Sequence, residues 1–368
     1  MRFLPELEGV RALAALAVVI THVSFQTATG WAWAERLDYG VAVFFVLSGF
    51  LLWRRRHAHT VGQYALSRVA RLAPLYVVCV VAVLALLPDA SPLTLPQLLT
   101  NLTGTQLYIA DGLVPGLTQL WSLCVEFAFY AVLPLMAWAL DRFSARGRVL
   151  LIAGAGVLSL GWGFLPFVAG FESGQVNTQI WPPAYFSWFA VGMLAAEAEA
   201  AQVRLRAGRV VRPVCWAVAA GCVWLASREW FGPQGLVHPA PDEFARRIAA
   251  GAVCGACVVV PVALSPRESW LAAPLMRALG RWSYGVFLWH VAVLAIAFPL
   301  LGVDPFTGSA GDFAVVAAFT VVVSCALSAA TYVLVEVPGR DLIRSLAATR
   351  GVRRLSGLVK RGLAHGIF

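Results

Sequence analysis

Long apolar segments alternate with short polar stretches along almost the whole chain. An α-helix rises about 1.5 Å per residue, so about 20 consecutive apolar residues cross the hydrocarbon core of a bilayer. Each apolar segment is close to that length, although the third is shorter. The pattern predicts an all-α polytopic membrane helix bundle with about ten transmembrane helices, placed at residues 10–28, 37–53, 73–88, 119–140, 149–169, 182–200, 213–231, 246–264, 282–301 and 313–336.

The composition indicates the same class of protein. Hydrophobic residues make up 60% of the chain and charged residues 13%, whereas a soluble domain is about half apolar and about a quarter charged. The seven cysteines all lie in apolar segments and are expected to pack as small hydrophobic residues. Cys254 and Cys257 have the spacing of a redox or metal motif but lack a second pair, so no metal site is predicted.

The basic residues are distributed unevenly between the two sets of connections. If the amino terminus is cytoplasmic, 24 of the 28 basic residues fall on the cytoplasmic side. This bias favours that orientation and predicts that both termini are cytoplasmic. The net charge of +9 therefore indicates topology and lipid contact, not nucleic-acid binding. Residues 341–368 alternate apolar and basic positions, which predicts a basic amphipathic tail on the inner leaflet.

Two ionisable residues share one face of the first predicted span. Arg11 and His22 are eleven positions apart, which is close to three helical turns and about 16 Å along the axis. Arg11 would then lie at the membrane border and His22 near the middle of the bilayer. An ionisable side chain at that depth is costly unless it faces the bundle interior or water, which favours a functional role over simple packing.

A second basic pair lies before the third predicted span. Arg68 and Arg71 are three positions apart, so on a helix they share a face and can converge on one anion. Guanidinium groups suit phosphate oxygens, and the predicted side is the cytoplasm. The alternative is that both residues are topology anchors or contacts to lipid headgroups.

The fourth predicted span contains a carboxylate well inside its apolar run. Glu126 shares a face with Ser122 and Tyr130 at a spacing of four residues. A buried carboxylate needs a partner, and His22 or an arginine is expected. A purely structural ion pair is the alternative. The ninth span contributes a second intramembrane histidine, His290, for which an interior hydrogen-bonded role and a direct role are both open.

In chain order, these stretches resemble the acyltransferase-3 family of integral membrane O-acyltransferases. The resemblance extends over residues 5–340, which predicts an acyltransferase-3 type transmembrane domain at 1–340 followed by the tail. Singly each motif is weak, and together they are specific. They are Arg11-x10-His22, the run from Phe44 to Leu51, Arg68-x-x-Arg71 before Pro74 and Tyr76, Leu120 to Pro134 with Glu126, Ser283 to Gly285 with Leu288 to His290, and Glu336-x-Pro338.

The resemblance implies transfer of an acyl group, usually acetyl, from a cytoplasmic acyl-CoA to a hydroxyl group. The acceptor would be a carbohydrate, a lipid-linked glycan or a natural product, and the location the inner (plasma) membrane of a bacterium. By the same resemblance, the catalytic residues are His22, Glu126 and Arg11. The donor would be held by Arg68, Arg71, Ser48 and Tyr76, and the acceptor would meet Trp121, Ser122, Tyr130, Tyr284 and His290.

The residue chemistry is compatible with that activity. The acceptor hydroxyl must lose its proton as it attacks the thioester, and histidine exchanges protons near neutral pH. The rival hypothesis is a transporter or flippase for an amphipathic substrate. Such a protein would use His22 and Glu126 as a proton relay, without covalent chemistry.

Overall fold

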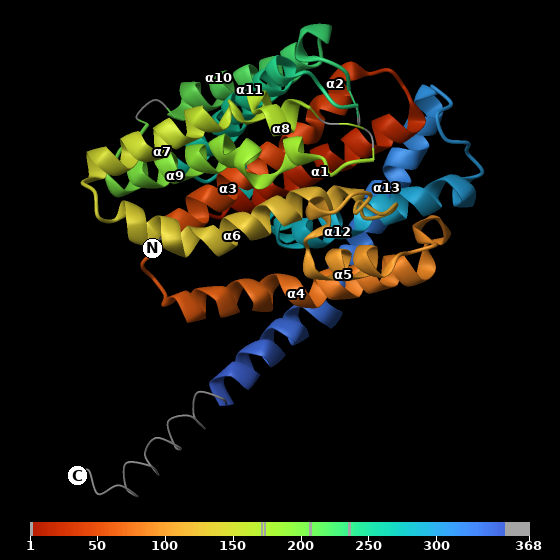
Figure 1. Cartoon of the computed structure of the whole chain (residues 1–368), viewed down its shortest axis with the longest axis horizontal. Coiled ribbons are helices and arrows are strands. Elements are labelled where there is room, and N and C mark those ends of the chain that lie inside the picture. The colour runs from red at the N-terminus through yellow and green to blue at the C-terminus, as the bar shows by residue number, and fades with distance from the viewer. Residues whose placement is uncertain (1–2, 171, 173, 206–207, 235–236, 350–368) are drawn as a thin grey trace, which may run out of the picture.

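The computed structural model describes residues 3–170, 172, 174–205, 208–234 and 237–349, and helices dominate this part of the chain without any strand (Figure 1). The predicted all-α class is therefore confirmed. Seven helical segments of the described residues are long and apolar enough to cross a membrane. They contain α1 (Glu6–Thr27), α3 (Gly40–Arg54), α4 (Val61–Leu86), α6 (Trp121–Leu140), α11 (Pro241–Leu264), α12 (Pro274–Leu301) and α13 (Ala310–Thr331).

The other three predicted spans correspond to shorter helices. These are α7 (Ala145–Ser159), α9 (Phe186–Ala200) and α10 (Gly208–Ala226). The prediction of one continuous helix over 149–169 is wrong, because α7 ends at Ser159 and Leu165 has an extended backbone. A residue before proline is pushed out of the helical region, and Pro166 follows. The total of ten spans remains a prediction.

Short elements fill the connections between these helices. They are α2 (Ala32–Glu35), α5 (Leu95–Thr103), α8 (Pro166–Ala169), the 3₁₀ turns Arg36–Tyr39, Pro88–Ala90, Gln106–Tyr108, Thr118–Leu120, Trp162–Phe164, Thr178–Ile180, Pro182–Tyr185, Glu229–Phe231 and Trp270–Ala272, and a π-helical turn at Tyr332–Glu336.

The third long helix begins well before the predicted span 73–88. Thr60 caps α4: its hydroxyl accepts from the Gln63 amide at 3.3 Å, and its own amide donates to the Gln63 side chain at 3.1 Å. This reciprocal pair satisfies two amides that a helix start leaves without partners. Arg68 and Arg71 consequently lie on a helix, and not in an inside loop that reaches residue 72 as predicted.

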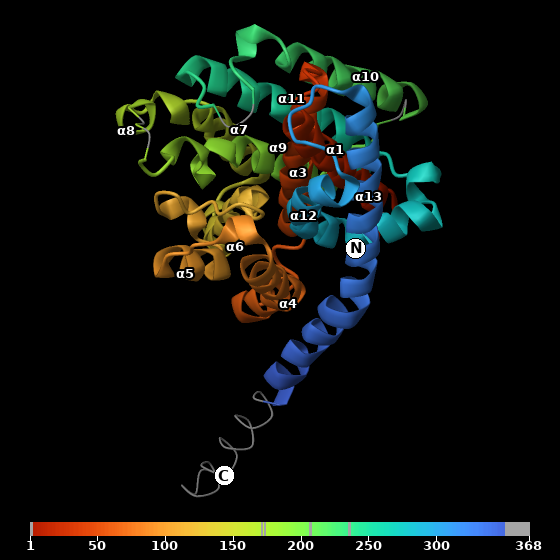
Figure 2. The same cartoon turned by 90° about the vertical axis from the view of Figure 1, so that its right-hand side faces the viewer.

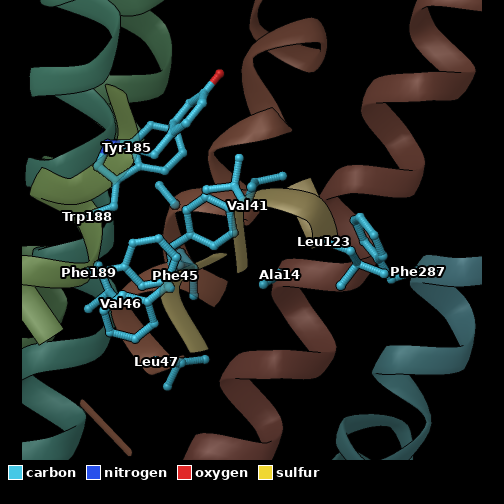
Figure 3. Packing of buried hydrophobic residues seen from close by; sticks show 14 of the residues in the cluster. Ala14, Val41, Phe45, Val46, Leu47, Leu123, Tyr185, Trp188, Phe189 and Phe287 are labelled. Atoms are coloured by element: carbon cyan, nitrogen blue, oxygen red, sulfur yellow. The ribbon is translucent and has the colours of Figure 1, made fainter. Parts of the chain in front are cut away.

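The middle of the bundle is formed by α1, α3 and α12, with α10 and α11 on one side and α4 with α5 on the other (Figure 2). Aromatic rings of α3, α6 and α9 make up part of the core. The Phe45 and Phe189 rings stack with centroids 4.5 Å apart, and Phe129 stacks on Phe189 at 4.0 Å. Figure 3 shows Phe45 and Phe189 side by side in this core.

Close packing of α3 against α9 requires glycine. A Cβ added to Gly49 would lie 3.1 Å from the Phe189 Cα and 3.0 Å from its carbonyl carbon, too close for any side chain. The backbones of α3 and α9 therefore approach closely at Gly49, and α3 continues through this position without a break. Since Gly49 faces α9, the neighbouring Ser48 faces α6.

A buried ion pair ties together three segments that the charge pattern assigns to one side of the membrane. Glu6, at the start of α1, binds Arg212 through two hydrogen bonds of 2.6 and 2.9 Å. It also accepts from the Arg267 amide at 2.8 Å and from the Ser269 hydroxyl at 2.6 Å. The chain start and the connections 201–212 and 265–281 therefore meet at one end of the bundle. That this end is cytoplasmic remains a prediction.

The last described helix extends out of the bundle. The π-helical turn at Tyr332–Glu336 joins α13 to a further helical stretch up to residue 349, which projects beyond α4 (Figures 1 and 2). The first nine residues of the predicted tail 341–368 are thus helical. Residues 350–368 lie outside the described residues, and the amphipathic tail remains a prediction there.

Candidate active site

A cavity that is partly open to solvent lies between α1, α3, α4, α6 and α12. Eight of the twelve predicted site residues line it, although they come from five different helices. They are Arg11, Ser48, Arg68, Arg71, Ser122, Glu126, Tyr130 and Tyr284.

The Glu126 carboxyl group is held by two hydroxyl groups at the cavity wall. Ser48 of α3 donates to Glu126 Oε1, and Tyr130, one turn along α6, donates to the same oxygen from 2.5 Å. Glu126 has no ion pair with His22 or with any arginine within the described chain, and Arg68 acts on it only at longer range. Ser48 and Glu126 are 78 residues apart in the chain, and no sequence pattern indicated that they would be in contact.

Two guanidinium groups line the cavity without a salt bridge. Arg68 and Arg71 are half-buried on α4, and neither forms an ion pair among the residues that the structure describes. Arg68 interacts only at longer range with Glu126, and Arg71 with Glu336. The Arg68 side chain donates to the Ser67 hydroxyl at 3.4 Å and lies 6.0 Å from the Tyr130 ring centroid. Partly buried cations without a close counter-charge are costly, so an anionic ligand in the cavity would relieve that cost.

The third arginine of the cavity is already paired. Arg11 Nη1 lies 2.9 Å from Glu8 Oε1, one turn before it on α1. Tyr284 also has a partner, because its hydroxyl donates to the Leu72 carbonyl at 2.9 Å and so joins α12 to α4. These contacts hold the helices around Arg68 and Arg71. Of the arginines that line the cavity, those two have no salt bridge within the described residues.

The two intramembrane histidines contact each other. His22 Nδ1 and His290 Nε2 are 3.3 Å apart, and the ring centroids are 4.8 Å apart with the planes at 70°. His290 is 0% exposed. Neither histidine lines the cavity, but Phe287 does, and its ring centroid lies 5.8 Å from that of His290. The pair therefore lies just beyond the Phe287 wall, and the His22–Glu126 relay that a transporter would need is not formed.

Two predicted site residues lie away from the cavity. Tyr76 is buried, and its hydroxyl donates to the Asn101 carbonyl at 2.7 Å, which fixes α5 against α4. Trp121 packs on Tyr185 with centroids 5.0 Å apart. In this structure both side chains support the fold around the cavity and do not line it. Sequence reasoning missed Phe44, whose ring lines the cavity beside Phe287 with centroids 6.3 Å apart.

Comparisons with known proteins identify the family of the chain. The family model described as an acyltransferase domain (Acyl_transf_3) matches residues 4–329. The chain is 26% identical over 334 residues to peptidoglycan O-acetyltransferase OatA of Listeria monocytogenes, covering 82% of this chain and 51% of that protein. It is 27% identical over 339 residues to acyltransferase MdmB of Streptomyces mycarofaciens, covering 81% of each.

The chain thus spans about half the length of the Listeria relative. O-acetyltransferase OatA of Staphylococcus aureus is 26% identical over 221 residues, covering 50% of this chain and 35% of that protein. No solved structure matches the chain. Because the family model covers most of the sequence, the chain belongs to the Acyl_transf_3 acyltransferase family, and it is a multi-pass membrane enzyme that transfers acyl groups.

Proposed function

We propose that this enzyme moves an acetyl group from a cytoplasmic acyl-CoA to a hydroxyl group of a carbohydrate, a lipid-linked glycan or a natural product. The observation that carries the proposal is the cavity that Arg68 and Arg71 line without a salt bridge to any described carboxyl group. Two similar proteins are named as O-acetyltransferases, which supports oxygen as the accepting atom.

The donor end of the cavity suits coenzyme A. This molecule carries several phosphate groups, and its thioester stands at the end of a long, flexible arm. Arginine forks bind phosphate oxygens through charge-assisted hydrogen bonds, which are about twice as strong as neutral ones. Phosphates at Arg68 and Arg71 would leave the arm free to extend between the helices, toward the wall formed by Phe44 and Phe287.

The transfer itself needs a group that accepts the proton of the acceptor hydroxyl. As the hydroxyl oxygen bonds to the thioester carbonyl carbon, its proton passes to the imidazole of His22. The carbon–sulfur bond then breaks, and the thiolate of coenzyme A takes that proton. In a second route, the lone pair of His22 attacks the thioester carbonyl carbon, the carbon–sulfur bond breaks and the thiolate of coenzyme A leaves. The acceptor hydroxyl then attacks the acetyl group on His22, which releases the imidazole, and the hydroxyl proton passes to the thiolate. Both routes require a ring nitrogen of His22 with a free lone pair.

The acceptor is proposed only as a class. Hydroxyl and aromatic side chains are abundant on the cavity wall, with Ser122 and Tyr130 on α6, which suits a hydroxyl-bearing ligand. The name of the Listeria relative gives peptidoglycan as its acceptor. For this chain, a small or lipid-linked acceptor is proposed.

The test is acetyl-CoA turnover by the full chain in lipid nanodiscs. Release of free coenzyme A thiol is followed with acetyl-CoA alone and with a panel of monosaccharides, lipid-linked sugars and peptidoglycan fragments. We expect acceptor-dependent thiol release, and a loss of about 10²–10⁴ in rate for His22→Ala with acetyl-CoA binding retained. No acetyl-CoA binding at millimolar concentration would refute the donor, and near-normal transfer by His22→Ala would refute the mechanism.

A further inference from the structure

We propose that His290 is a positioning residue that holds His22 in a single tautomer, with the proton on Nδ1 and the lone pair on Nε2. The inference rests on the proposed function, because it states which nitrogen of His22 reacts. The evidence is the set of hydrogen bonds around the two rings, because the partner of each ring nitrogen indicates whether that nitrogen donates or accepts.

The His290 ring has its own orientation fixed by its helix. His290 Nδ1 lies 2.9 Å from the Phe287 carbonyl oxygen and 3.2 Å from the Val286 carbonyl oxygen. A carbonyl oxygen can only accept, so Nδ1 of His290 must carry a proton. In a neutral imidazole the other nitrogen then has a lone pair. His290 Nε2 is therefore an acceptor, and it points at His22.

The contacts of the His22 ring assign its proton in the same way. Its Nδ1 faces two acceptors, the Val18 carbonyl oxygen at 2.9 Å and His290 Nε2 at 3.3 Å. This nitrogen must carry the proton, which leaves His22 Nε2 as the nitrogen that takes a proton or an acetyl group. The two acceptors require the same proton on His22 Nδ1. The Val18 carbonyl belongs to the helix of His22 itself, whereas His290 Nε2 comes from α12 and can be removed by a side-chain substitution.

The two helices that carry the rings pack closely near their starts. A Cβ added to Gly280 of α12 would lie 2.6 Å from the Glu8 carbonyl carbon of α1, and one added to Gly9 would lie 2.8 Å from the Cα of Leu271, in the turn before α12. Further along the same two helices, His22 and His290 face each other. When His22 gains a proton on Nε2, the Nδ1–H bond to His290 becomes charge-assisted and stronger.

In many enzymes a carboxylate orients the reacting histidine. In this site the carboxyl group does not contact His22. Glu126 is bound by Ser48 and Tyr130. A neutral imidazole in the orienting position supplies the same acceptor without placing a negative charge in the membrane interior, where an unpaired charge is costly.

The first measurement is the tautomer itself, read by ¹⁵N NMR of the full chain in nanodiscs with labelled histidine. The chain has six histidines, so the His22→Ala spectrum identifies the His22 signals. We expect Nδ1 of His22 to be protonated and Nε2 unprotonated in the wild type, with the Nε2–H form emerging in His290→Phe. A wild-type His22 protonated on Nε2, or a tautomer unchanged in His290→Phe, would overturn the inference.

The second measurement is acetyl-CoA turnover of two His290 variants. Loss of an orienting partner of a reactive histidine costs about 10–100-fold. We expect that loss in kcat for His290→Phe, with the KM for acetyl-CoA unchanged. His290→Gln should recover most of the rate, because its amide oxygen can accept from His22 Nδ1. Leu294→Val, one turn further along α12 and equally buried, is the control for packing and should stay near wild-type activity.

The outcomes separate this inference from the proposed function. Full activity of His22→Ala would defeat the proposed mechanism while the NMR spectrum still reports the tautomer. An inactive His22→Ala together with a fully active His290→Phe would leave the proposed function standing and overturn the role of His290. Equal losses for His290→Phe and His290→Gln, with the tautomer unchanged in both, would also overturn it.

Discussion

Ser48 and Glu126 share a hydrogen bond across two helices, α3 and α6, although 78 residues separate them in the chain. Tyr130 donates to the same carboxylate oxygen, so that Glu126 is held by two neutral donors. Arg68 and Arg71, on the wall of the same cavity, form no salt bridge with it, although Glu126 acts on Arg68 at longer range. The carboxyl group of the cavity is thus bound by hydroxyl groups and not by either arginine.

This relationship predicts a coupled response to mutation. Hydrogen bonds to a charged group contribute about 1.5–3 kcal/mol, so Ser48→Ala and Tyr130→Phe should each lower acetyl transfer by about 10–100-fold. Glu126→Gln should be impaired at least as strongly. Residues of one network are not additive, so Ser48→Ala should add little to Glu126→Gln.

The measurement is a double-mutant cycle on acetyl-CoA turnover. Ser187→Ala is the matched control, because Ser187 is a buried serine on α9 whose hydroxyl has no partner. Fully additive losses would mean that Ser48 and Glu126 act independently.

Much of the fold could be predicted from sequence, because the number and rough position of the helices depend on the length of each run of apolar residues. The start of α4 also had a local signal, since Thr60 and Gln63 have the spacing of a capping box. The break after α7 had one as well in Pro166. What failed at these points was the assumption that hydropathy alone sets the helix ends.

The partners inside the site could not be predicted, because they depend on which helices pack together. His22 and His290 are 268 residues apart, and their contact follows from the approach of α1 to α12. The arginines that precede the two histidines gave a weak indication that the histidines lie at a similar depth. Arg11 is eleven residues before His22, and Arg281 is nine before His290. Two spans that start on the same side would place both histidines at nearly the same depth.

Membrane sidedness is a separate prediction from the arginine bias. In a background without the seven native cysteines, His59→Cys before α4 and Thr103→Cys at the end of α5 should react with an impermeant thiol reagent from opposite sides of inverted vesicles. The residue 59 probe should be on the cytoplasmic side. Labelling of both positions from one side would reject the topology and, with it, a cytoplasmic donor at Arg68.

The buried pair of Glu6 and Arg212 predicts a large effect on stability. Removing one partner of a buried ion pair costs about 3–5 kcal/mol, because the remaining charge keeps no counter-charge. Arg212→Ala should therefore lower the thermal unfolding temperature markedly. Arg246→Ala, which breaks the exposed pair with Asp242 at 2.8 Å, should change it little. Unfolding followed by tryptophan fluorescence in nanodiscs measures both, and equal shifts would argue against a structural role of Glu6.

The last prediction concerns the donor site, on which the proposed chemistry depends. Arg68→Gln and Arg71→Gln should each weaken acetyl-CoA binding by about 1.5–3 kcal/mol, the scale of a hydrogen bond to a charged group, or roughly 10–100-fold in Kd. Arg55→Gln is the matched control, because Arg55 is an exposed arginine at the end of α3 that does not line the cavity. Isothermal titration of purified protein with acetyl-CoA gives the three affinities. If coenzyme A phosphates are bound here, dephosphorylated donor analogues should lose affinity for the wild type and lose less for the two variants. Unchanged Kd values in both variants would leave Arg68 and Arg71 as topology anchors and move the donor to another part of the enzyme.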